Sequence, residues 1–93
     1  MKIVLNNNEY ELIKEYKNAF VLEEVETLTT DYFKDFDYIL GDYAYNKLRL
    51  KGFYDDENKK ANEINKFSYL EEYIENYCAY DCRYFVLARK KSK

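Results

Sequence analysis

Three cations at alternate positions of one short segment are the residues of this sequence best suited to chemistry. Lys47, Arg49 and Lys51 occur in "NKLRLKGFY", and Tyr45 precedes them. In a β-strand, alternate side chains point to the same face, so the three charges would form a ladder. Such clusters attract phosphate groups, and an exposed tyrosine stacks on unpaired bases. The pattern predicts a polyanion-binding or RNA-binding face, and the competing interpretation is a solvated strand whose charges resist edge aggregation.

The same region holds both glycines of the chain, Gly41 and Gly52. Alternating apolar residues predict a β-hairpin over residues 37–54. If its two-residue turn lies at Asn46 and Lys47, the two glycines face each other across the hairpin. Facing glycines remove two side chains from the middle of the apolar face.

Two uses of that space stay open. Either a bulky aromatic side chain such as Tyr73 or Tyr77 fills it, or it is a ligand slot bordered by the glycines with Asp42 and Tyr43. In the same register Asp42 faces Lys51, which predicts a cross-strand ion pair.

Acidic side chains gather at the open end of the predicted hairpin, where neighbouring carboxylates suit a hard cation or general acid–base catalysis. They are Asp37, Asp42, Asp55, Asp56 and Glu57. Acidic runs are also typical of solvated loops. A carboxylate-based, metal-dependent enzyme is therefore a remote alternative, and we expect no catalytic residues.

Other chemistries lack the necessary residues. The chain has no histidine, which excludes imidazole bases and the commonest metal ligand. Cys78 and Cys82 do not have the C-x-x-C spacing, and two thiols are too few for a tetrahedral zinc site. We expect reduced thiols, with Cys78 on an apolar helix face; a redox pair or a zinc site shared by a dimer stays open. No metal or cofactor is expected.

Five strands and two helices must position these residues. In the N-terminal half the predicted elements are a hairpin of residues 1–5 and 9–16, turning at 6–8, and a helix of about 15 residues from Leu22 to Phe36. Strands 37–45 and 47–54 follow, and then a loop over 55–66. The chain continues with a helix from Phe67 to Cys78, in which Ser68 and Glu71 form a capping box, and a strand over 83–89. This β-β-α-β-β-α-β order predicts a small α+β domain whose mostly antiparallel sheet carries both helices on one face.

Composition places these elements in one soluble domain. The chain of 93 residues is long enough for a single core, predicted over residues 1–89, and residues 90–93 form a basic tail expected to be disordered. No uncharged run approaches the about 20 residues of a membrane span or the about 7–15 of a signal peptide, so a cytoplasmic location is expected. Twelve tyrosines exceed what so small a core needs, and aromatic residues are enriched at protein interfaces.

Two long stretches of the chain resemble a known family. "DYILGDYAYNKLRLKGFYDDENKKA" and "LEEYIENYCAYDCRYFVLARK" are similar to the YutD-like proteins, which are small cytosolic proteins of low-GC Gram-positive bacteria. The likeness runs from about Asp37 to Arg89. It implies the fold and the location, and it carries no established activity onto these residues.

The sequence therefore predicts a binding domain without enzymatic activity. The first hypothesis is a polyanion-contacting or RNA-contacting regulatory module that uses Lys47, Arg49, Lys51 and Tyr45. The second is a protein-interaction or homodimerisation module that uses surface tyrosines.

Overall fold

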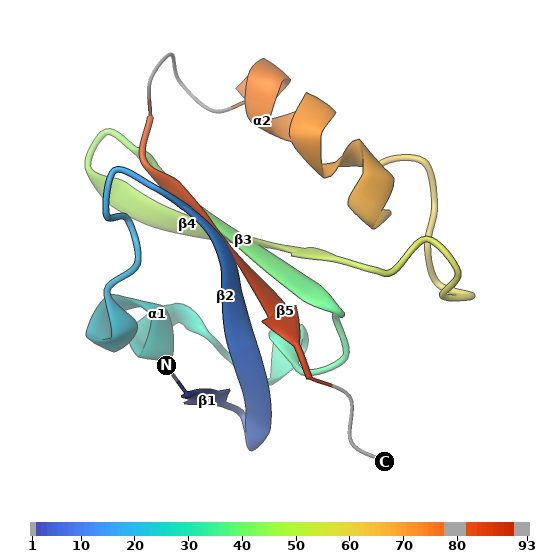
Figure 1. Ribbon diagram of the computed structural model, residues 1–93, viewed down its shortest axis with the longest axis horizontal. Helices are drawn as coiled ribbons and strands as arrows, with labels where there is room; N and C mark the ends of the chain where they lie inside the picture. Colours follow the sequence, from blue (N-terminus) through green and yellow to red (C-terminus); the bar gives the residue numbers. More distant parts are fainter. Residues whose placement is uncertain (1, 78–81, 91–93) are drawn as a thin grey trace.

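Five antiparallel strands form a single sheet with helices on both of its sides (Figure 1). The computed structural model describes residues 2–77 and 82–90. Its elements are β1 (Ile3–Leu5), β2 (Asn8–Tyr16), α1 (Leu22–Leu28), a 3₁₀ turn (Asp31–Phe33), β3 (Tyr38–Ala44), β4 (Lys47–Phe53), a second 3₁₀ turn (Phe67–Tyr69), α2 (Leu70–Tyr77) and β5 (Tyr84–Arg89). The strands lie in the order β1-β2-β5-β3-β4. The predicted α+β class and element order are confirmed.

Both hairpins turn through two residues with left-handed backbone. The turn between β1 and β2 uses Asn6 and Asn7, at φ values of 52° and 64°. The turn between β3 and β4 uses Tyr45 and Asn46, at 53° and 64°. Two successive left-handed residues make the tight turn that matches the twist of a hairpin. The second turn lies one residue earlier than predicted.

That shift changes every cross-strand partner in the β3–β4 hairpin. Gly41 pairs with Leu50, and Gly52 pairs with Ile39, so the two glycines do not face each other as predicted. Each partner moves by two residues, which keeps every side chain on its predicted face because the side-chain period of a strand is two.

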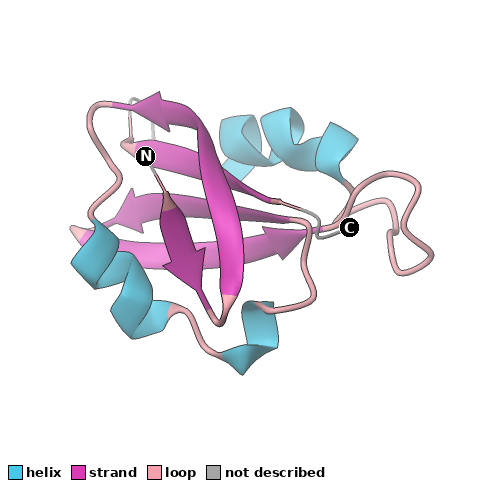
Figure 2. Ribbon diagram, turned by 60° about the horizontal axis from the view of Figure 1, so that its bottom comes forward, coloured by secondary structure: helices cyan, strands magenta, loops and turns pink. Residues whose placement is uncertain are grey.

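The prediction that both helices lie on one face is wrong. Val25 of α1 packs in a cluster with Ile39 and Leu87, whereas Leu70 of α2 packs with Leu40 and Val86 on the other face. Figure 2 shows the strands between α1 and α2. The physical reason is that β3 and β5 carry apolar residues on both faces, so each face needs a cover.

The first helix is shorter than the predicted span from Leu22 to Phe36. It ends at Leu28, and Thr29 and Thr30 are extended. The hydroxyl of Thr29 donates to the carbonyl oxygen of Val25 at 2.6 Å. The backbone N–H of Thr29 donates to the same carbonyl oxygen at 2.9 Å, so both groups of Thr29 satisfy Val25 at the end of the helix.

The second helix begins differently from the predicted capping box. A 3₁₀ turn precedes α2, and the backbone N–H of Ser68 donates to Oδ1 of Asp56 at 2.9 Å. The carboxylate therefore comes from the preceding loop. These bonds from the turn hold the pKa of Asp56 below its usual value.

Of the predicted tail, residues 90–93, the structure describes only Lys90. Lys90 donates its backbone N–H to the carbonyl oxygen of Glu9 at 2.8 Å, and its ammonium lies 3.3 Å from the Glu9 carboxylate. Positions 91–93 lie outside the described residues. None of the described helices has the length and apolar character needed to cross a membrane.

Candidate interaction surface

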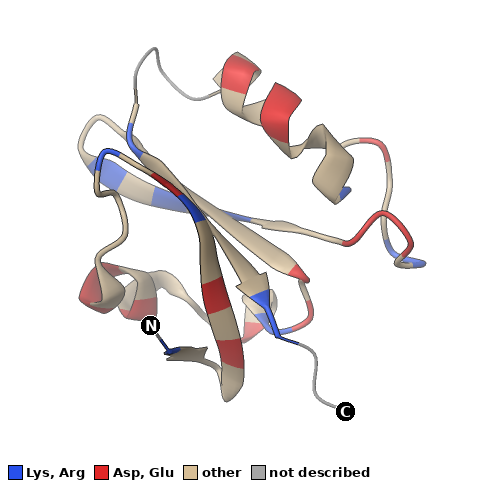
Figure 3. Cartoon of the chain, in the orientation of Figure 1, with Lys and Arg blue, Asp and Glu red and all other residues tan. Residues whose placement is uncertain are grey.

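The cationic ladder exists, and its three side chains share the α2 face of β4. Lys47, Arg49 and Lys51 pair with Ala44, Asp42 and Leu40 of β3. Figure 3 shows these cations along β4. Lys47, at the turn, is exposed.

Arg49, the middle cation, is held by a buried carboxylate. Its Nη2 lies 2.7 Å from Oδ2 of Asp42, and its Nε lies 3.1 Å from Oδ1. The Asp42 side chain is 5% exposed and the Arg49 side chain 46%. The hydrogen bond to Asp42 raises the pKa of Arg49. The predicted Asp42–Lys51 pair is therefore wrong, and Arg49 compensates a charge of the protein itself.

Lys51 lies over aromatic rings instead. Its Nζ is 5.2 Å from the ring centroid of Phe53 and 5.4 Å from that of Tyr73 in α2. Cations at this distance from a ring face are attracted by its quadrupole. The ladder thus offers one fully projecting cation, Lys47, one stacked cation and one paired cation.

The space above the glycines is filled by aromatic rings. A Cβ on Gly41 would lie 2.1 Å from Cζ of Phe85, and one on Gly52 would lie 2.2 Å from Cγ of Phe36. The filling rings are therefore not Tyr73 or Tyr77. Asp42 points to the opposite face from Gly41, since neighbouring residues of a strand alternate. The residues predicted as a ligand slot are thus divided between two faces.

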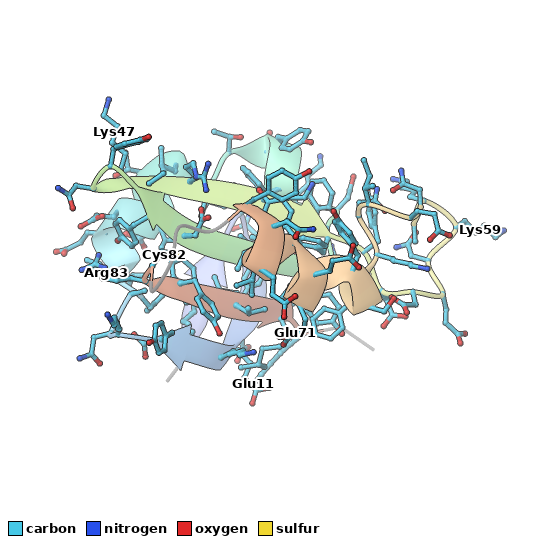
Figure 4. All side chains as sticks on the ribbon, turned by 90° about the horizontal axis from the view of Figure 1, so that it is seen from above. Glu11, Lys47, Lys59, Glu71, Cys82 and Arg83 are labelled. Carbon is cyan, nitrogen blue, oxygen red and sulfur yellow. The ribbon has the colours of Figure 1, made fainter. Side chains whose placement is uncertain are left out.

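Tyr43 lies beside an open hollow of about 530 Å³ at the turn end of the sheet. Its hydroxyl donates to Oε1 of Glu24 at 2.9 Å, and Cζ of Arg83 lies 4.0 Å from its ring centroid. Burial, followed by the bond to Glu24, raises the pKa of Tyr43. Lys17, Tyr45, Asn46 and Cys82 complete the lining, and Figure 4 places Cys82, Arg83 and Lys47 at this end.

The acidic residues at the other end have structural partners. Asp37 is buried, accepts the backbone N–H of Asp55 at 2.8 Å and lies 3.2 Å from Nη2 of Arg89. Asn58 donates to the same carboxylate at 3.1 Å. Within residues 2–77 and 82–90, no group of three potential metal ligands occurs. Cys82 is disulfide-bonded, so the expected reduced thiol is wrong there, and Cys78 lies outside the described residues.

Apolar side chains border β4 on its α1 side, and the sequence did not single them out. Leu28, Tyr32 and Ile64 are 40%, 71% and 62% exposed. Leu28 and Leu48 line a hollow of about 380 Å³, while Tyr32, Leu50 and Ile64 line another of about 250 Å³. One sequence feature could have indicated this surface: Ile64 is a lone large apolar residue in a polar loop.

Comparison with known proteins places the chain in a family. A family model described as "Putative antitoxin YutD-like" matches residues 4–88. The chain belongs to the YutD-like family. The Bacillus subtilis (strain 168) protein named "Putative antitoxin YutD" is 46% identical over 87 residues, which cover 94% of this chain and 96% of that protein. The solution NMR structure of yutD from B. subtilis has a TM-score of 0.81 and 43% identity, covering 99% of this chain and 84% of that one. The predicted family is confirmed, and the solved structure of a family member shows that the two proteins share a fold.

Proposed function

We propose that this YutD-like domain functions by binding another protein, as an antitoxin that occupies its partner. One observation carries the proposal: Leu28, Tyr32 and Ile64 expose apolar surface along one border of the sheet. Grouped apolar and aromatic side chains on a small domain are typical of interaction sites. The names of the family and of its B. subtilis member support the same function.

The carboxylates support binding over catalysis. Asp37 and Asp42 are engaged by arginines, and Asp56 accepts a backbone N–H at the start of α2. A general base must be within reach of a substrate proton, whereas these groups are occupied in holding the fold. The proposed place of action remains the cytoplasm, as the family resemblance predicts.

Native mass spectrometry of the untagged protein purified from its own host tests the proposal. We expect a complex with one protein species that persists when the salt concentration is raised, because apolar contacts are not screened. A monomer at cellular concentration, or a complex with oligonucleotides alone, would contradict it. A homodimer without any other species would support the alternative of self-association.

A second candidate function is polyanion binding at the β3–β4 turn. Tyr45 is 99% exposed and stands in the two-residue turn, whose left-handed backbone is unfavourable for a bulky residue. It lies beside Lys47 and the hollow lined by Lys17 and Arg83. This arrangement would suit a base stacked on Tyr45 with phosphates near the cations.

Fluorescence anisotropy with a labelled oligouridine, measured over a salt series, tests this candidate. If Lys17, Lys47 and Arg83 contact phosphates, the logarithm of affinity should fall with a slope of about −2 against the logarithm of salt concentration. Lys47→Glu should weaken binding, and Lys59→Glu on the distant loop is the matched control. Salt-independent or absent binding would reject the candidate.

A further inference from the structure

β4 is an edge strand of the sheet. It pairs with β3 on one side and ends the strand order. It has seven residues, whereas β1 at the opposite edge has three. Figure 4 shows β4 as the outermost strand. A long edge strand offers unpaired backbone groups to another chain.

The hydrogen-bonding pattern shows which backbone groups face outward. Ala44 and Lys47 close a two-residue turn, so the backbone of Lys47 points toward β3, and those of Arg49 and Lys51 follow at period two. The intervening residues Leu48 and Leu50 therefore point away from β3.

Tyr54 confirms this alternation. Just beyond β4, its N–H donates to the carbonyl oxygen of Asn65 and its carbonyl oxygen accepts from the N–H of Phe67, both at 2.8 Å. Gly52, two residues earlier, shares its outward orientation. Within the described part of the chain, no hydrogen bond is found for the outward backbone groups of Leu48, Leu50 or Gly52.

The two flanks of this edge differ in chemistry. On the α1 side, Leu48 and Leu50 adjoin the exposed apolar residues and their two hollows. The lining of these hollows also includes Glu24 and Lys47 in one and Lys51, Asn62 and Asn65 in the other. On the α2 side, Lys47 and Lys51 carry positive charge, while Arg49 is balanced by Asp42. One side therefore favours apolar neighbours and the other favours carboxylates.

We propose that β4 binds an extended segment of the partner protein as a sixth strand of the sheet. This inference rests on the proposed protein-binding function and assigns its site. The segment alternates apolar residues, which pack toward α1, with acidic residues, which face Lys47 and Lys51. Its length is bounded by the turn at Tyr45 and by Asn65, which occupies the edge beyond Gly52. Backbone pairing supplies affinity in such strand addition, and alternate side chains supply specificity.

Charge repulsion disfavours a second copy of this chain as the occupant. An antiparallel pairing of two β4 strands would set Lys47 and Lys51 of both copies side by side, whereas Arg49 is balanced by Asp42. Like charges across strands are destabilising. An acidic partner segment removes that repulsion.

Amide hydrogen exchange measured by NMR, with a capped Ac-VEVEVEV-NH2 peptide as the probe, tests the inference. In the free protein, the amides of Leu48, Leu50 and Gly52 should exchange quickly, whereas those of Arg49 and Lys51 should be protected. The peptide should slow exchange at the three outward amides. The capped Ac-VKVKVKV-NH2 peptide is the matched control and should not.

Two results would overturn the strand-addition model. The first is protection of Leu48 and Leu50 in the free protein. The second is binding of the glutamate peptide without protection of the outward amides, or equal binding of both peptides.

Variants separate this site from the rest of the surface. Leu50→Pro removes an outward N–H, a position at which edge strands tolerate proline, and should reduce peptide affinity at least about tenfold. Lys47→Glu should reduce it about fivefold. Lys59→Glu lies on the projecting loop shown in Figure 4 and should have no effect. If Leu50→Pro fails to fold, the two lysine variants still decide, because equal affinities would overturn the inference.

The proposed function and this site can fail separately. A native partner complex that survives both Leu50→Pro and Lys47→Glu would overturn the site and leave the function. If the peptide protects the β4 amides but native mass spectrometry finds no protein partner from the host, the proposed function is overturned and only the peptide-binding property of the β4 edge remains.

Discussion

Replacing Arg49 by methionine should destabilise the domain far more than the same change at Lys47. Asp42 is 5% exposed and Arg49 is its charged partner, so Arg49→Met leaves a buried carboxylate unpaired. Breaking a buried ion pair costs about 3–5 kcal/mol. Because Arg49 is 46% exposed, solvent screening reduces the expected loss to about 2 kcal/mol. That corresponds to a fall in Tm of roughly 8–16 °C for a domain of this size.

Chemical denaturation followed by circular dichroism measures this loss, with Lys47→Met as the matched control. Lys47 is exposed, so its variant should stay within about 0.5 kcal/mol of the parent protein. Asp42→Asn combined with Arg49→Met should be less destabilised than the sum of the single variants, because the amide removes the buried charge. If Arg49→Met behaved like Lys47→Met, Arg49 would be free to bind a ligand and our interpretation of the ladder would be wrong.

Three further changes test the core and the start of α2. Gly41→Ala should cost about 3 kcal/mol, because its Cβ would lie 2.1 Å from the Phe85 ring; a loss below about 1 kcal/mol by urea denaturation would contradict this packing. Tyr10→Phe should be neutral or stabilising by about 1 kcal/mol, because the buried hydroxyl has no hydrogen-bond partner among the described residues, and a clear loss would contradict it. The lowered pKa of Asp56 contributes stability above its unfolded pKa of about 3.9, and this is lost as pH falls through the lower folded pKa. The Tm advantage over Asp56→Asn should therefore shrink below about pH 4, and a pH-independent difference would refute the role of its charge.

The register of the central hairpin shows what the sequence could not decide. Turns at Tyr45–Asn46 and at Asn46–Lys47 each contain one asparagine, and moving between them shifts partners by two residues. Such a shift keeps the same side chains buried, so the apolar pattern fits both registers equally. The choice determines whether Asp42 meets Lys51 or Arg49, and only the structure settles it.

Elements with strong local patterns were predicted well. The "YFVLA" segment is the core of β5, with Phe85, Val86 and Leu87 buried, and the Asn6–Asn7 turn follows from residues that tolerate left-handed backbone. The continuous apolar run in β5 also indicated that both faces of the sheet are covered. The prediction that both helices lie on one face did not take this into account.

The candidate surface was only half predictable. The two-residue alternation of side chains along a strand correctly predicted that the three cations share one face. The ion pair that neutralises Arg49 depends on the strand register, which places Asp42 opposite it. Leu28 and Tyr32 fit the apolar face of a predicted long helix, so their exposure could not be inferred. They are exposed because the helix ends at Leu28.

The position of β5 also governs when the sheet can form during synthesis. β5 pairs with β2 on one side and with β3 on the other, yet it is synthesised after both hairpins. A nascent chain therefore holds two separate hairpins that share no sheet until residues 84–89 insert between them. Non-local pairing of this kind slows folding. Assembly of the single sheet therefore requires β5, and a protease that removes β5 would divide the sheet into two hairpins in one cut.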